Sequence, residues 1–261
     1  MLPELIYREE QQDNYLLLFG LGLLSGLIGY MVASIVFPSQ VSVLAVVFAS
    51  IPLVYPLTRT FLEDEAEGRP HVDEIFIYAS LFLGEVAAFF LLVLLVPMDL
   101  SVQLSQFSAQ LQAMGINTVA GSEVGSILTG QATSLGNFAS IALHNLTLFA
   151  LIIVVSGIVS SSGAFILVWN ASVLGVFLGV LVDQLSGVEL LTGNGQIATP
   201  LAYVPHTTFE MAGFIIAGIS GSLISAAVYR EHFDRENWVY YAKLIGTGIA
   251  FILVAAFLET A

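Results

Sequence analysis

The chain has 261 residues, of which 57% are hydrophobic and only 10% are charged, and it contains no cysteine. Its apolar residues form stretches too long and continuous for the helices of a soluble core. The composition therefore excludes a water-soluble protein, and the absence of cysteine excludes disulfides and thiol chemistry. A formal net charge of −14 argues against a nucleic-acid partner.

The ratio of acidic to basic residues points to a saline environment. Twenty Asp and Glu stand against six Lys and Arg. Many carboxylates keep an exposed surface hydrated in high salt, so we expect an archaeal or halophilic source. The alternative is that a chain lying mostly in a membrane has few exposed positions, and that its small loops are acidic by chance.

About seven apolar stretches approach the roughly 20 residues of helix that cross a bilayer. They run approximately over 15–37, 41–58, 75–96, 138–160, 163–183, 205–229 and 240–258. The second is the shortest and contains Pro52 and Pro56, so we expect it to be kinked or tilted. The sequence predicts an all-α, polytopic transmembrane helical bundle, multi-pass in the cell membrane, with the lipid bilayer as its first partner.

Basic residues set the predicted orientation, because Lys and Arg are retained on the cytoplasmic side of a membrane. With the N-terminus inside and the C-terminus outside, every basic residue falls in or beside a cytoplasmic segment. These residues are Arg8, Arg59, Arg69, Arg230, Arg235 and Lys243. The two longer outside segments, 97–137 and 184–204, contain no Lys or Arg.

A polar, acidic linker over 63–74 separates the first two spans from the others. We therefore expect an N-terminal transmembrane hairpin over 1–62 and a five-helix membrane core over 75–261. The core includes a long external loop, 97–137. Apolar residues near its start recur at helical spacing, which predicts a helix that either lies on the outer membrane surface or packs under the loop. They are Leu100, Leu104, Phe107, Leu111 and Met114.

Small residues recur every four positions in several spans, which lets helix backbones approach closely in lipid. Packing within one chain is the usual outcome. Contact between copies in a homo-oligomer, or with other membrane proteins, is the alternative, and the Gly22/Gly26 face of the first span is its best candidate. The rows are Gly22/Gly26, Ser25/Gly29, Ala171/Gly175/Gly179 and Gly213/Ala217/Gly221.

Polar side chains at membrane depth are the candidate functional residues, because their burial there is costly unless they are paired or used. Glu85 falls near the middle of the third span. His206 and Glu210 are four residues apart and share one helix face. We expect Glu210 to be hydrogen-bonded to His206 or to the His144-Asn145 pair. The candidate intramembrane polar cluster is Glu85, His144, Asn145, Asn170, His206 and Glu210.

The cluster has a structural and a functional interpretation. In the structural one, Pro205 is the first residue of its helix, Glu210 lies near the helix start, and the polar groups tie neighbouring helices together. In the functional one, they form a proton or ion pathway, or a ligand site that opens outward. No metal, cofactor or catalytic site is predicted, because His-x-x-x-Glu lacks the second His of the zinc motif and no nucleophile elbow is present.

Three motifs carry a family resemblance. A helix after the long external loop has His144-Asn145, the next has Asn170-Ala171, and a later one starts Pro205-His206-Thr207-Thr208-Phe209-Glu210. In order and spacing they resemble the stage II sporulation protein M family, whose motifs are paired asparagines, Asn-Gly and Pro-His-Gly-x-x-Glu. This chain departs from the pattern at His144, Ala171 and Thr207. The resemblance covers about residues 75–258 and leaves the hairpin as an addition.

The resemblance implies a membrane scaffold or transport-type component without an active site of its own. Bacterial members of that family work in a complex with cell-wall hydrolases during engulfment of the forespore. We therefore expect a non-enzymatic scaffold or assembly subunit. The alternative is a transporter or channel whose polar cavity is formed by Glu85, His144, His206 and Glu210.

Single-cysteine labelling tests the orientation, since the chain has no cysteine of its own. A membrane-impermeant maleimide should label Ser105→Cys from outside, and a cysteine placed in 230–239 only from the cytoplasmic side. Labelling of Ser105→Cys from the cytoplasmic side alone would contradict the predicted topology.

Overall fold

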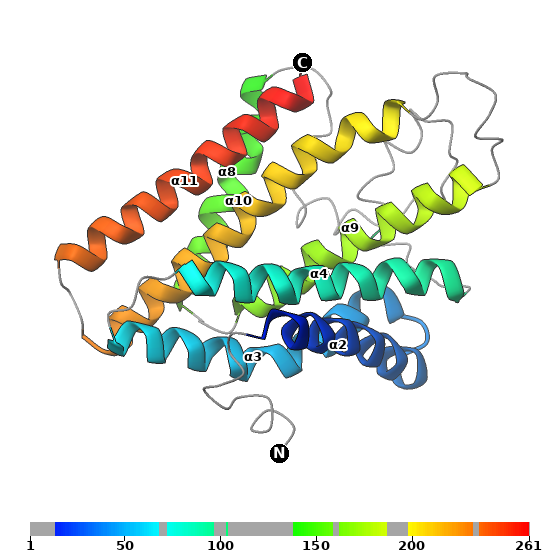
Figure 1. The fold of residues 1–261 in the computed structure, drawn as a ribbon, viewed down its shortest axis with the longest axis horizontal. Helices are drawn as coiled ribbons and strands as arrows, with labels where there is room; N and C mark the ends of the chain where they lie inside the picture. The colour runs from blue at the N-terminus through cyan, green and yellow to red at the C-terminus, as the bar shows by residue number, and fades with distance from the viewer. Residues whose placement is uncertain are drawn as a thin grey trace.

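The computed structural model describes residues 14–67, 72–96, 103, 138–158, 162–186, 198–231 and 235–260. Within these ranges the chain forms seven helices and no strand (Figure 1). The helices are α2 (Tyr15–Val36), α3 (Val41–Glu67), α4 (Val72–Leu95), α8 (Phe138–Ile158), α9 (Ser162–Ser186), α10 (Ala198–Tyr229) and α11 (Arg235–Thr260). The predicted all-α architecture is confirmed.

Six of the seven helices are long and apolar enough to cross a bilayer. In α3 the described apolar stretch, Val41–Val54, is shorter than that. This is the span that the sequence marks as the shortest. The chain is therefore a multi-pass membrane protein, while its predicted orientation stays a prediction.

The helices form two groups, each built on a central helix. In the first group, α4 lies between α2 and α9, and α3 packs against both α2 and α9. In the second group, α10 packs against α8 and α11 (Figure 1). The α8–α9 hairpin joins the groups, because α8 packs mainly on α10 and α9 mainly on α4. Its two helices consequently make few contacts with each other.

Glycine brings α2 and α4 into backbone contact. A Cβ added at Gly22 would collide with the carbonyl oxygen of Leu81, and one added at Gly84 with the carbonyl oxygen of Phe19. At Gly26 an added Cβ would lie 2.6 Å from the Cβ of Ala88. The Gly22/Gly26 face is thus buried within the chain, so its proposed use in a homo-oligomer is wrong.

The other small-residue rows also serve packing within the chain. An added Cβ at Gly29 would lie 2.5 Å from the backbone nitrogen of Ala49 in α3, and one at Gly175 would lie 2.5 Å from the carbonyl oxygen of Val86 in α4. At Gly221 it would lie 2.5 Å from a carbonyl oxygen of α8. Small residues therefore set the spacing of helices in both groups.

Several helix boundaries differ from those expected. Helix α10 begins at Ala198 and contains Pro205 in its interior, so the assignment of Pro205 as a first helical residue is wrong. Helix α3 continues to Glu67, which makes part of the expected 63–74 linker helical. The division into a hairpin and a five-helix core stays a prediction. The packing of α2 on α4 crosses that division.

Gln103 is the one described residue within 97–137. Its side chain is fully buried. The Ser42 hydroxyl of α3 donates to the Gln103 amide oxygen, and the Gln103 amide nitrogen donates to the Ser42 carbonyl oxygen at 2.7 Å and to the Ser172 hydroxyl of α9 at 3.5 Å. The apolar stripe predicted around it, Leu100 to Met114, lies outside the described residues.

Two alanine substitutions on α2 test the glycine contact. Gly22→Ala should lower the free energy of unfolding by roughly 1 to 3 kcal/mol, because a methyl group there meets the α4 backbone. Gly20→Ala is the matched control, since an added Cβ there has nothing within 4 Å. The control should be neutral or stabilising by up to about 1 kcal/mol. Equal melting of both variants in detergent would contradict the tight α2–α4 contact.

Candidate functional site

The structure places Glu85, Asn170 and Glu210 at three different helix interfaces. Glu85 faces α2 from α4, Asn170 lies on the side of α9 that faces α8, and Glu210 lies between α10 and α11. His144 and Asn145 are near the start of α8, and His206 precedes Glu210 by one turn. Glu85 and Asn170 therefore lie at different helix interfaces, while a shared site for the other four residues stays a prediction.

Glu85 is fully buried at the centre of its span. A Cβ added at Gly26 of α2 would lie 2.6 Å from Oε2 of Glu85. The carboxyl group therefore packs directly against α2. Neither carboxyl oxygen has a hydrogen-bond partner among the described residues. The hydroxyl of Ser25 lies beside this carboxyl but donates to the Ala49 carbonyl oxygen at 2.7 Å. Burial of a carboxyl group without a described partner is costly at membrane depth.

Glu210 has an acidic neighbour that the sequence reading missed. Glu259, at the end of α11, lies close enough for direct electrostatic interaction with Glu210. The two helices are held together here by an edge-to-face contact between Phe209 and Phe251, with ring centroids 5.6 Å apart. His206 is buried and its Nε2 lies 3.3 Å from the Thr207 hydroxyl. A hydrogen bond between Glu210 and His206 stays a prediction.

His144 and Asn145 each carry a buried polar atom without a partner in the described part of the chain. These atoms are Nε2 of His144 and Oδ1 of Asn145. Glu210 therefore makes no hydrogen bond to either of these two atoms of the His144-Asn145 pair. Ile141 and Ala142, one turn earlier, pack against Ala256 of α11, so this end of α8 is held by apolar contacts.

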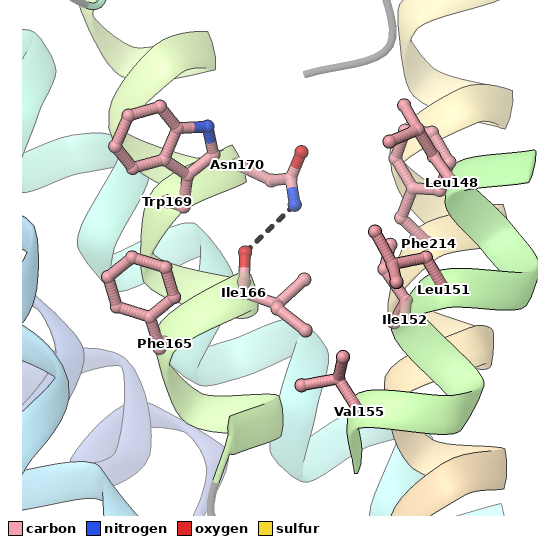
Figure 2. Close-up of a pocket in the computed structure, with 9 residues that line it drawn as sticks. All are labelled: Leu148, Leu151, Ile152, Val155, Phe165, Ile166, Trp169, Asn170 and Phe214. Atoms are coloured by element: carbon pink, nitrogen blue, oxygen red, sulfur yellow. Dashed lines mark hydrogen bonds between the residues drawn. The ribbon is translucent and has the colours of Figure 1, made fainter. Parts of the chain in front are cut away.

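Asn170 lies at a cavity of about 150 Å³ between α8 and α9. Its Nδ2 donates to the carbonyl oxygen of Ile166 at 2.8 Å, while its Oδ1 has no partner among the described residues (Figure 2). The Trp169 indole N–H is likewise buried without a described partner. The lining residues are Leu148, Leu151, Ile152, Val155, Phe165, Ile166, Trp169, Asn170 and Phe214.

Three contributors to these environments were missed for identifiable reasons. Glu259 falls one residue beyond the expected last span, 240–258, so hydropathy places it outside the membrane. Ser25 was assigned to a packing row and not to the neighbourhood of Glu85. Trp169 directly precedes Asn170 in sequence. Its indole N–H can only donate, so a tryptophan in the middle of a span indicates a donor that needs an acceptor.

The fold and its apolar helices define a polytopic α-helical membrane protein. A family model described as stage II sporulation protein M matches residues 15–261. The chain therefore belongs to the stage II sporulation protein M family. The match begins at the start of α2, so it includes the N-terminal hairpin that the sequence resemblance over 75–258 left out. No curated protein and no solved structure matches the chain.

Substitutions at Glu85 test whether its carboxyl group is without a partner. Glu85→Met keeps most of the side-chain volume and should raise the free energy of unfolding by about 1 to 3 kcal/mol, because a buried polar group without a partner is removed. Glu85→Gln should change it little, because the amide group that it introduces lacks partners in the same way. Leu83→Met, on the exposed side of α4, controls for methionine itself. Thermal melts in one detergent give the comparison. A lower melting temperature for both Glu85 variants would mean that the carboxyl group holds a stabilising partner.

Proposed function

We propose that the protein is a non-enzymatic membrane scaffold or assembly subunit. The observation that carries the proposal is the dispersal of its buried polar groups. Glu85 lies between α2 and α4, Asn170 between α9 and α8, and Glu210 with Glu259 between α10 and α11. A conducting protein needs such groups along one continuous path, whereas a scaffold needs only a rigid bundle.

The glycine contacts and the family support the same proposal. Backbone-to-backbone approaches at Gly22, Gly84 and Gly175 hold α2, α4 and α9 at fixed spacing, as a rigid platform requires. The resemblance noted in the sequence implies work in a complex with other proteins. Assembly with partner proteins in the membrane is accordingly the role we propose for this chain.

A transporter or channel is the second candidate, and Glu85 is the observation that favours it. A fully buried carboxyl group at the centre of a span, without a described hydrogen-bond partner, is the kind of group that takes up and releases a proton or a cation. Against this, the carboxyl group packs against Gly26 and does not line the cavity between α8 and α9.

Reconstitution and native extraction separate the two candidates. A scaffold should extract from its native membrane in a particle larger than the chain purified alone, with a second protein in fixed stoichiometry. Proton, sodium and potassium fluxes in proteoliposomes should equal those of empty liposomes for the wild type and for Glu85→Gln. A native particle no larger than the isolated chain, together with a flux that Glu85→Gln abolishes, would overturn the scaffold in favour of transport.

A further inference from the structure

The cavity between α8 and α9 arises from the way the fold divides. The two helices are joined by a short connection from Ile158 to Ser162, yet each packs on a different central helix. Apolar side chains of α8 therefore face Ile166 and Asn170 of α9 across an open space (Figure 2). A volume of about 150 Å³ is that of known protein cavities that take up a six-carbon ring.

The amide oxygen of Asn170 in this cavity lacks a hydrogen-bond donor in the described part of the chain. Only the amide nitrogen of Asn170 can donate to the Ile166 carbonyl oxygen, and the 2.8 Å bond therefore fixes which way the amide group is turned. The amide oxygen, Oδ1, is then left pointing toward α8 (Figure 2). Asn170 is only 5% exposed, and Oδ1 has no partner among the described residues. A group that satisfies it must be a hydrogen-bond donor.

The cavity is reached from the surface that faces the lipid. Leu151 and Val155 line it and are 50% and 38% exposed, respectively. Both lie within α8, whose sequence is that of a membrane span, so their exposed parts contact hydrocarbon chains. An occupant therefore enters sideways from the bilayer, and most of its surface must be apolar to match the lining.

We propose that this cavity binds a hydroxyl-bearing hydrocarbon from the bilayer, with the hydroxyl group donating to Asn170 Oδ1. A plain acyl chain fills the apolar space but leaves Oδ1 without a donor, which is costly at this depth. A hydroxyl group removes that cost by donating to Oδ1. Its oxygen can also accept a hydrogen bond from the buried indole N–H of Trp169, which lines the same cavity. The ligand class is thus a membrane-dissolved alcohol.

Photolabelling of the full chain in nanodiscs tests the proposal. The probes are 3-azioctanol and 3-azioctane, which carry the same photoreactive diazirine and differ in the hydroxyl group. We expect saturable adducts on the α8 and α9 segments that line the cavity. The half-saturating mole fraction in the bilayer should be about fivefold lower for the alcohol, the factor that one hydrogen bond supplies. Absence of saturable adducts there, or equal values for the two probes, would overturn it.

Three variants test whether the probes bind in the cavity and whether the alcohol is recognised by Asn170. Val155→Phe should fill the space and abolish the labelling by both probes. Val254→Phe is the matched control, because Val254 is 39% exposed on α11 and does not line the cavity. Asn170→Leu should keep the alkane adducts and remove the advantage of the alcohol. Labelling that survives Val155→Phe, or an alcohol preference that survives Asn170→Leu, would contradict the proposed site. The alcohol-to-alkane comparison on the wild type stands whether or not Asn170→Leu folds.

Discussion

The approach of α2 to α4 through glycine is the contact on which the first helix group depends. Within a membrane there is little hydrophobic force to bring helices together, so contact area and backbone proximity must supply the attraction. Gly22 and Gly84 let each helix reach a carbonyl oxygen of the other. The same proximity seals Glu85 against α2 and away from lipid. Larger residues at these positions would separate the helices and expose a carboxyl group to hydrocarbon.

The second constraint is the connection between α8 and α9. A short link requires the ends of the two helices to be neighbours, but the packing partners of the helices lie in different groups. The helices therefore diverge, and the cavity between them is lined on α9 by Phe165, Ile166, Trp169 and Asn170. This divergence leaves the cavity of about 150 Å³ beside Asn170.

The sequence predicted the fold well because hydrophobic length is a strong signal in membrane proteins. It located each of the seven helices in the described ranges and marked the second span as the shortest. It failed where partners far apart in sequence decide the outcome. The row Gly22/Gly26 has the same pattern whether it meets another copy or, as found, α4. Likewise, Pro205 matches a helix start, yet α10 begins at Ala198.

Four of the six candidate polar residues are buried, namely Glu85, Asn145, Asn170 and His206, and the sequence could not predict which helices they face. Periodicity places His206 and Glu210 on one face of a helix, and it holds no information on which helix that face meets. Glu259 of α11 came close to Glu210 only once the chain was folded. Asn170 was selected for its residue type, whereas the direction of its amide group depends on the Ile166 carbonyl oxygen.

Gln103 gives the bundle a mechanical link to the segment that follows α4. One amide group is bound to the backbone and side chain of Ser42 and to Ser172, and the Ser172 hydroxyl donates in turn to the Trp169 carbonyl oxygen at 2.8 Å. Tension applied to this segment would be shared between α3 and α9, because both are held by the same side chain. On α9 the load would arrive one residue before Asn170, at the wall of the cavity.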